Sequence, residues 1–477
     1  MKISLFALNG SFAHSALAVR CLRSALVANG FDCEITEGNL RDRTLPLLQT
    51  LVAKNADLYG FSCYVWNIEQ MLSLAQSLKA IRPECRILLG GPEVSFDTER
   101  FASLSFVDHI IKHEGEEAIV TLARDLADGK TPPRVIEGTP DRDFAARGIH
   151  YAENDPVTPL IYYESSRGCP FSCAFCLSCT QDGVRAKSAA QTLAELAEFE
   201  KMEGNFTVKL VDRTFNFDRE RAKLIWRGLL DEKYTKCYHF EIAAHLLDEE
   251  CFEILGSFPE GKVRLEIGLQ STNKKTLAAV SRHTDAEAVL AAAKRLTEQN
   301  ACRVHLDLIA GLPHEDLQSF ARSFDAAYPC CHELQLGFLK LLHGTPLRRD
   351  AATFGVVFEA ISPYTVLKTD VLSFEDVCLL HRVSDLCERL HDSGRFAHSL
   401  PFILSFCPSP FAFFAELDAY LSEKTGKELQ KTSQRDLFWH LSGFAKAKLP
   451  ESAHETLSTL LRADFGAAEV RRPPKGL

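Results

Sequence analysis

Residues 160–179 read LIYYESSRGCPFSCAFCLSC and decide the fold of the middle of the chain. An apolar, β-rich run leads into a loop that carries Cys169, Cys173 and Cys176 in the spacing C-x₃-C-x₂-C. Three thiolates on one short loop can hold three irons of a cubane iron–sulfur cluster and leave the fourth iron open. A tetrahedral zinc site is the alternative, with Cys179 as its fourth ligand.

Apolar, β-rich runs recur along the middle of the chain at intervals of about 30 residues, the length of a βα unit. They occur at 160–165, 206–211, 238–243, 263–269, 303–310 and 333–339. Helical patterns, such as 285–299, fill the gaps. Six βα units predict a partial (β/α)6 barrel, in which chemistry gathers at the carboxyl ends of the strands. The cysteine loop follows the first strand, at that expected edge.

Charged and amide side chains interrupt these apolar strands. They are Asp212 after the second strand, Glu241 and His245 at the third, Glu266 and Gln270 in the fourth, and Asp307 in the fifth. Buried groups of this kind need polar partners. A full ring of them favours a polar ligand inside the barrel, whereas the alternative is that they are solvated or pair with one another.

The first third of the chain alternates short apolar runs with helical patterns. Strands are predicted at 2–8, 32–36, 58–63, 86–90 and 107–111, and helices at 15–29, 45–54, 67–81 and 116–128. Such alternation predicts an α/β fold with a doubly wound parallel sheet, which binds ligands beyond the carboxyl ends of its strands.

Small and polar residues collect at those strand ends. They are Asn9 and Gly10, then Ser62 and Tyr64, then Gly90, Gly91, Pro92 and Glu93, and finally Glu114, Gly115 and Glu116. Glycines let a large ligand approach the backbone closely, although Gly90-Gly91-Pro92 could also be a simple turn. The glycine-rich motifs of dinucleotide and nucleoside triphosphate sites are absent from the sequence.

Composition narrows the class of protein. The chain has 477 residues, of which 46% are hydrophobic and 25% charged, and this excludes a fibre, a coiled-coil rod or a disordered chain. The net charge of −10 argues against broad capture of nucleic acid. Sixteen cysteines are too few for a disulfide scaffold, and no long apolar run or signal peptide is recognised. We therefore expect a cytoplasmic protein without membrane or nucleic-acid partners.

The last third is predicted to be mostly helical, with 3.6-residue spacing at 375–393, 411–424 and 451–463. Its Phe-rich segment 401–421 is either a helical core packed on the barrel or the wall of a substrate pocket. The expected domains are therefore residues 1–135 (sheet), 136–158 (a proline-containing linker), 159–365 (barrel) and 366–477 (helical domain).

Three strings of the first third, LYGFSCYVWN (58–67), LLGGPEVS (88–95) and IIKHEGEEAI (110–119), resemble the cobalamin-binding domain that precedes many radical S-adenosylmethionine (SAM) enzymes. The resemblance implies that the strand-end residues named above contact cobalamin. The loop after the first strand reads NGSFAHSA and lacks the Asp of the D-x-H-x-x-G loop that supplies an axial histidine. The resemblance thus implies cobalamin without histidine ligation, and His14 is expected at a helix start.

The cysteine loop is identified as the radical SAM signature, which implies a 4Fe-4S cluster that chelates SAM. Phe175 would pack near the adenine. The strings EIGLQS (266–271), SRHT (281–284) and LDLIAGLPHED (306–316) resemble oxygen-independent coproporphyrinogen oxidases and their relatives. That resemblance implies further SAM contacts: Glu241 and Gln270 to the ribose or methionine groups, Arg282 to the carboxylate, and Asp307 to the ribose hydroxyls. The usual Gly-Gly-Glu segment is absent, so Asp212 would bind the SAM amino group.

The order of these parts resembles the cobalamin-dependent radical SAM family over most of the chain. The resemblance implies reductive cleavage of SAM to a 5′-deoxyadenosyl radical, and methyl transfer to an unactivated carbon of a small-molecule or peptide substrate. Flavodoxin or ferredoxin would donate the electron. Two alternatives stay open: a radical cyclase or rearrangement enzyme related to anaerobic magnesium-protoporphyrin ester cyclase, and a non-catalytic cobalamin or iron–sulfur sensor.

Overall fold

The computed structural model describes residues 1–141, 144–180, 183–425 and 432–468. The chain forms two compact units. The first comprises Met1–Glu241 together with Leu341–Arg349 and Glu359–Thr365. The second comprises Ile242–Lys340, Asp350–Phe358 and Val366–Leu477. Two short segments that follow the barrel strands in sequence therefore belong to the N-terminal unit.

An all-parallel sheet lies at the N-terminal end of the first unit, in the strand order β2-β1-β3-β4-β5-β6. Its strands are β1 (Lys2–Asn9), β2 (Asp32–Asn39), β3 (Leu58–Ser62), β4 (Arg86–Gly90), β5 (His109–Lys112) and β6 (Val135–Glu137). The five predicted strands are confirmed. The short β6 was not predicted, because its three residues are not fully buried and carry no hydrophobic period.

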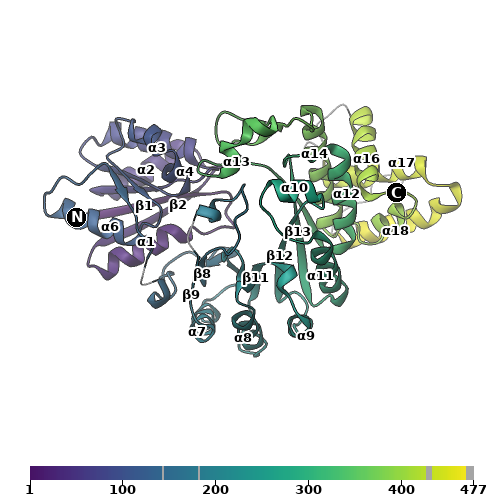
Figure 1. The fold of residues 1–477 in the computed structure, drawn as a ribbon, viewed down its shortest axis with the longest axis horizontal. Helices are drawn as coiled ribbons and strands as arrows, with labels where there is room; N and C mark the ends of the chain where they lie inside the picture. The colour runs from purple at the N-terminus through teal and green to yellow at the C-terminus, as the bar shows by residue number, and fades with distance from the viewer. Residues whose placement is uncertain (142–143, 181–182, 426–431, 469–477) are drawn as a thin grey trace. The chain divides into compact units, whose positions relative to one another are not determined.

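Helices cover both faces of this sheet (Figure 1). They are α1 (Leu17–Ala28) and α6 (Glu116–Ala127) on one face, and α2 (Thr44–Lys54), α3 (Ile68–Ile81), α4 (Pro92–Phe96) and α5 (Thr98–Ala102) on the other. Side chains alternate along a strand, so Leu5 packs in the core under α1 and α6, whereas Phe6 packs in the core under α2 and α3. Burial on both faces explains why β1 is mostly apolar between its two ends.

The six predicted barrel strands are confirmed. In the first unit β7 (Leu160–Tyr163), β10 (Thr207–Leu210) and β11 (Cys237–Ile242) pair in parallel, and in the second unit β12 (Val263–Gln270), β13 (Cys302–Ala310) and β14 (Glu333–Phe338) do so. The intervening helices include α7 (Ala189–Glu200), α8 (Arg219–Leu229), α9 (Glu249–Gly256), α10 (Lys274–Ala279), α11 (Ala286–Gln299) and α12 (Leu317–Ala327). A Ser, Asp or Asn side chain caps the first turn of each, which is why they begin where they do.

Helices dominate the end of the second unit, as predicted. They are α14 (Phe374–Cys387), the π-helical turn η7 (Glu388–Asp392), α15 (Ser399–Leu404), α16 (Pro410–Thr425), α17 (Gln434–Lys448) and α18 (His454–Ala467). Helices α15 and α17 were not predicted. Aromatic pairs bind this layer together: Phe396 stacks on Phe438, and Phe438 meets Phe465 edge to face.

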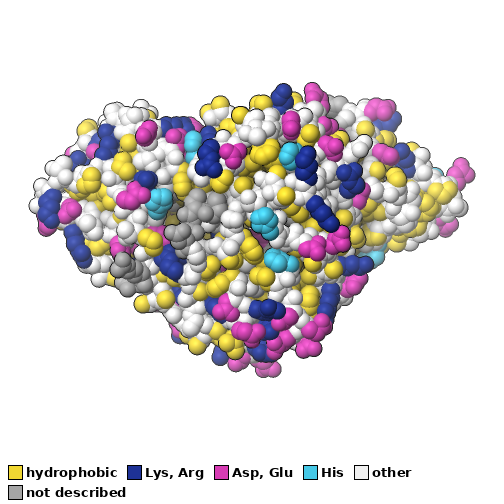
Figure 2. Space-filling model, viewed as in Figure 1, with side chains coloured by type: hydrophobic (Ala, Val, Ile, Leu, Met, Phe, Trp, Pro, Cys, Tyr) yellow, Lys and Arg dark blue, Asp and Glu magenta, His cyan; other side chains and the backbone are white. Residues whose placement is uncertain are grey.

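Acidic and basic side chains are interspersed on the molecular face shown in Figure 2, rather than gathered into one field of a single sign. Within the described residues, no helix combines the length and the apolarity that a membrane span requires.

Candidate functional site

A small hairpin carries the cysteine loop. Strand β8 (Ser166–Gly168) pairs antiparallel with β9 (Val184–Ala186), and Cys169, Cys173 and Cys176 follow β8 directly. Cys173 is buried and the other two cysteines are half-buried. Among the described residues none of the three takes part in a disulfide bond. The loop thus presents three thiols, the donor set of an open iron–sulfur site.

The backbone fixes where this loop starts. Gly168 has a φ of +94°, and a Cβ at this position would collide with the carbonyl oxygen of Gly183 across the hairpin. Only glycine meets both conditions without strain. Within the loop, the amide of Cys176 donates to the carbonyl of Cys173 at 3.0 Å, and the Ser178 amide donates to the Cys176 sulfur at 3.4 Å. The side chain of Cys179 lies outside the described part of the structure.

Asp212 follows β10 in sequence. Its buried carboxylate lies against the turn between β7 and β8. Its Oδ1 accepts from the amides of Ser165 at 2.7 Å and Ser166 at 2.8 Å, and its Oδ2 accepts from the Ser165 hydroxyl. Burial raises the pKa of Asp212, while the Ser165 and Ser166 donors and Arg221 oppose that rise. Asp212 therefore orients the turn immediately ahead of the cysteines, and its contact with SAM stays a prediction.

The predicted cobalamin residues lie at one edge of the N-terminal sheet, because all its strands are parallel. Ser62 is the register partner of Gly90. Gly91 has a φ of +114°, and a Cβ there would collide with the carbonyl of Cys63, while Gly10 has open space around it. Pro92 starts α4. An edge of glycines and short polar side chains leaves the backbone accessible to a large ligand.

The remaining residues of that edge are held by specific contacts. Asn9 donates to the carbonyl of His14 at 3.1 Å and to Glu37 at 3.0 Å, and Tyr64 stacks on Trp66 with ring centroids 4.3 Å apart. His14 lies before α1 rather than in it, and its Nδ1 is 2.6 Å from the Tyr162 hydroxyl. The Asn9 and Tyr64 contacts fix the loops that begin at the ends of β1 and β3.

Glu114 and Glu116 face the cysteine hairpin. Arg167 Nη1 donates to Glu114 at 2.8 Å and Arg167 Nη2 donates to Glu116 at 2.6 Å. Gly115 caps α6 between these two carboxylates. Two residues predicted to contact cobalamin therefore also reach the strand that leads into the cluster loop.

The segments 341–349 and 359–365 contribute residues that the sequence analysis missed. Tyr364 donates to the buried carboxylate of Glu93, and Ser362 donates to the carbonyl of Val65. The Leu347 amide donates to the carbonyl of Ala174, inside the cysteine loop, at 3.0 Å. No local sequence pattern predicts these contacts, since they join positions far apart in the sequence.

Three predicted SAM residues come together in the second unit. Gly268 is the register partner of Asp307, and Arg282 donates to the Gly268 carbonyl. Gln270 has a φ of +71°, and its buried Oε1 has no hydrogen-bond partner among the described residues. In the first unit Glu241 lies 4.0 Å from Lys209, and Phe175 is half-buried between Cys173 and Cys176. A guanidinium and an amide thus gather near the carboxyl end of β12, beside the strand that carries Asp307, and the Asp307 carboxylate lies 3.3 Å from His305.

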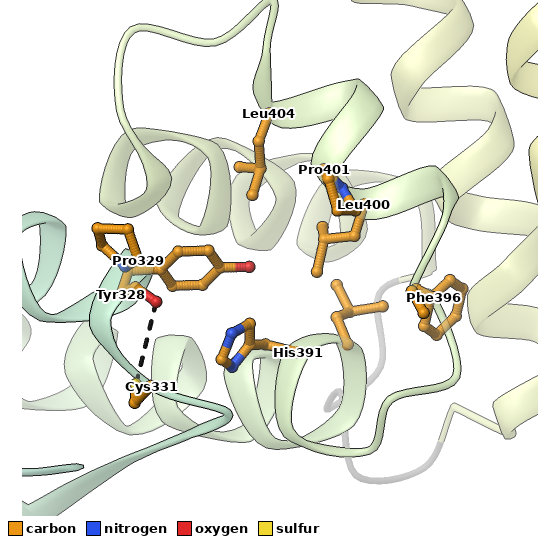
Figure 3. Close-up of a pocket in the computed structure, with 10 residues that line it drawn as sticks. Tyr328, Pro329, Cys331, His391, Phe396, Leu400, Pro401 and Leu404 are labelled. Atoms are coloured by element: carbon orange, nitrogen blue, oxygen red, sulfur yellow. Dashed lines mark hydrogen bonds between the residues drawn. The ribbon is translucent and has the colours of Figure 1, made fainter. Parts of the chain in front are cut away.

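A separate cavity of about 260 Å³ lies in the second unit, where Tyr328 and His391 meet the apolar side chains of α15 (Figure 3). Cys387, His391 and Asp392 beside it place potential metal-ligand atoms within 4.8 Å of one another. However, Asp392 Oδ1 already accepts from His391 at 2.8 Å and from the Leu334 amide at 2.9 Å. These contacts tie η7 to β14, and none of the predicted site residues lines this cavity.

Comparison with known proteins matches three segments to families. Residues 4–123 match the B12 binding domain, residues 163–327 match the Radical SAM superfamily, and residues 352–476 match a protein family of unknown function, DUF4080. The cobalamin-dependent radical SAM methyltransferase TokK of Streptomyces tokunonensis is 24% identical over 311 residues, which are 55% of this chain and 44% of TokK. The chain spans less than half the length of the curated relatives that it matches.

Solved structures share the fold. TsrM of Kitasatospora setae, a radical SAM methyltransferase, has a TM-score of 0.61 at 17% identity and covers 77% of this chain and 80% of its own. OxsB, a cobalamin-dependent SAM radical enzyme, has a TM-score of 0.64 at 14% identity and covers 99% of this chain and 82% of its own. The chain thus carries a segment that matches the B12 binding domain, followed by a segment that matches the Radical SAM superfamily and contains Cys169, Cys173 and Cys176.

Proposed function

We propose that this chain is a cobalamin-dependent radical SAM methyltransferase acting on an unactivated carbon of a small-molecule or peptide substrate. The observation that carries the proposal is that the sheet edge and the cysteine loop lie in one compact unit and are joined directly through Arg167. The curated relatives that carry the word methyltransferase or methylase in their names favour methyl transfer over cyclisation. A cytoplasmic flavodoxin or ferredoxin would donate the electron.

The residues present fit the cofactors that this function needs. Cys169, Cys173 and Cys176 would hold the 4Fe-4S cluster, because thiolates are the usual ligands of such clusters and three of them leave the fourth iron open. The backbone at Gly10, Gly90 and Gly91 would lie against cobalamin, with the other residues of that edge around it. When bound, the cluster, SAM and cobalamin together supply a radical and a transferable methyl group.

SAM would lie against the polar residues at the barrel strand ends. The Oε1 of Gln270, which has no hydrogen-bond partner in the described part of the chain, supports this assignment, because a buried amide oxygen without a donor is costly unless a ligand satisfies it. Arg282 would pair with the SAM carboxylate, the pairing that a guanidinium favours. Asp307, Glu241, Asp212 and Phe175 would complete the contacts. The work of these side chains is to orient the ligand and to exclude water.

Anaerobic reconstitution followed by incubation with SAM, aquacobalamin and dithionite tests the proposal. The expected products are 5′-deoxyadenosine and S-adenosylhomocysteine, with neither formed by the Cys173→Ala variant. A chain with a fully loaded cluster that forms no 5′-deoxyadenosine would contradict radical chemistry and favour a sensor. Formation of 5′-deoxyadenosine without S-adenosylhomocysteine would instead favour the cyclase alternative.

A further inference from the structure

Arg167 is the centre of a half-buried ion-pair network that reaches from the N-terminal sheet to the cysteine loop. Its Nε donates to Glu164 at 2.8 Å, its Nη1 to Glu114 at 2.8 Å and its Nη2 to Glu116 at 2.6 Å. The side chain is only 10% exposed. All three guanidinium nitrogens are therefore used, and the planar fork holds the three carboxylates in one arrangement.

A second arginine joins the same network from the other strand of the hairpin. Arg185 in β9 is the register partner of Arg167 in β8. Like charges directly opposite each other on antiparallel strands repel. Here Glu114 lies between them, with Oε2 accepting from Arg167 and Oε1 from Arg185. One carboxylate from the sheet edge thus bridges the two arginines on the strands that enter and leave the cysteine loop.

The segment between the sheet and the barrel completes the network. The Arg167 guanidinium lies over the ring of Phe144, with its central carbon 4.8 Å from the centroid. The Asp141 amide donates to Glu114 at 2.8 Å, and the Asp141 carbonyl accepts from Arg185 at 2.8 Å. Each charged group in this region has a partner of opposite charge, so a shift of the loop that carries Glu114 and Glu116 moves the hairpin with it.

We propose that Glu114, Glu116, Arg167 and Arg185 are positioning residues that couple the cobalamin edge to the iron–sulfur loop, so that each cofactor strengthens binding of the other. This inference rests on the proposed function, because it requires that the edge bind cobalamin and the loop bind a cluster. Glu114 and Glu116 flank Gly115 at the sheet edge, and Arg167 lies two residues before Cys169. Coupling between two sites is reciprocal, so it can be measured from the cobalamin side alone.

Equilibrium dialysis of aquacobalamin against the full chain, with and without the reconstituted cluster, measures this coupling. We expect the cluster to tighten cobalamin binding of the unaltered chain by about fivefold or more, the lower end of ordinary coupling between sites. In the Arg167→Lys variant this ratio should fall to about one, because lysine keeps the charge but replaces the planar guanidinium fork with a compact ammonium that cannot keep the three carboxylates in the same arrangement. The ratio is the decisive readout, since a merely structural loss weakens both forms alike.

The Arg185→Lys variant provides the same test if Arg167→Lys does not fold, since Arg185 is more exposed. Arg23→Lys is the matched control: Arg23 binds Asp155 through two nitrogens in the same unit but lies outside the network, and it should keep the full ratio. An unaltered chain whose ratio is one, or Arg167→Lys and Arg185→Lys variants that keep the ratio, would overturn the coupling alone. A chain that binds no aquacobalamin in either form would overturn the proposed function as well.

Discussion

The hydroxyl of Tyr364 donates to the carboxylate of Glu93 across 271 positions of sequence. Both side chains are buried. Burial raises the pKa of Glu93, and the hydrogen bond from Tyr364 opposes that rise. Arg348 adds a guanidinium over the Tyr364 ring, 4.6 Å from its centroid. A segment from after the last barrel strand therefore supplies the polar partner that a buried acid requires at the sheet edge proposed to bind cobalamin.

Tyr364→Phe should destabilise the first unit. It removes only the hydroxyl and leaves the buried Glu93 carboxylate without that donor, a loss of about 1–3 kcal/mol of unfolding free energy. Urea denaturation of the cobalamin-free chain measures this. Tyr234→Phe is the control, because the Tyr234 hydroxyl donates to a backbone carbonyl, at Leu193, rather than to a buried carboxylate. An equal loss of unfolding free energy in both variants would show that the hydrogen bond to Glu93 stabilises the fold no more than one to a backbone carbonyl.

Gly91→Ala should disrupt the sheet edge that we propose binds cobalamin. A φ of +114° is unfavourable for alanine, and its Cβ would collide with the Cys63 carbonyl. Strain of this kind costs about 1–3 kcal/mol, before any displacement of the backbone is counted. Gly148→Ala has nothing within 4 Å of the added carbon and should be neutral. Thermal unfolding of the two variants side by side checks the difference, and equal midpoints would contradict the prediction.

Gly10→Ala separates binding from stability. Gly10 has no positive φ and nothing within 4 Å of an added Cβ, so the variant should unfold like the unaltered chain. If cobalamin lies against this backbone, the extra methyl group occupies space that the ligand needs, and aquacobalamin affinity should fall by about tenfold or more, equivalent to about 1.4 kcal/mol. Unchanged affinity would place Gly10 outside the binding surface. Gly148→Ala again serves as the control.

Strands β1 and β3 of the N-terminal sheet could be predicted because burial on both faces favours continuous apolar runs. The cysteine loop could be predicted because its three ligands are local in sequence. Tyr364 could not, because its role depends on a return of the chain to the first unit. Nor could the pairing of Glu114 with Arg185, since hairpin register is a property of the folded loop. The short strand β6 could not be predicted either, because its three residues show no hydrophobic periodicity.

Cys173→Ala and Cys179→Ala should differ in metal content. The radical SAM interpretation requires Cys173 and assigns no ligand role to Cys179. After anaerobic reconstitution, the Cys179→Ala chain should retain about four irons per chain and the Cys173→Ala chain should lose most of them, since the cluster then lacks a thiolate. Iron and zinc analysis with the visible absorption spectrum measures this. Loss of metal in both variants, with zinc in the unaltered chain, would favour the four-ligand zinc site.

Glu315 should make the folded chain less stable as the pH rises, the opposite of the usual effect of a carboxylate. It is buried after β13, where it accepts from the Ser271 hydroxyl at 2.6 Å and from the Ser323 hydroxyl at 3.2 Å. Burial raises its pKa from 4.5 to about 7, although these hydroxyls oppose the rise. Because the folded chain holds this proton more tightly than the unfolded chain, its contribution is fully present below pH 4.5 and is lost as the pH rises through about 7.

The Glu315→Gln variant removes this titration while keeping an acceptor for the serine hydroxyls. The unfolding free energy of the variant minus that of the unaltered chain should increase by about 2–3 kcal/mol from about pH 5 to about pH 8. The reason is that the amide never has to lose a proton in a buried site. Urea denaturation at both pH values measures the gain. Glu298→Gln, on the exposed surface of α11, should show no such change. Parallel pH profiles for Glu315→Gln and the unaltered chain would mean that Glu315 is ionised without cost in the folded protein.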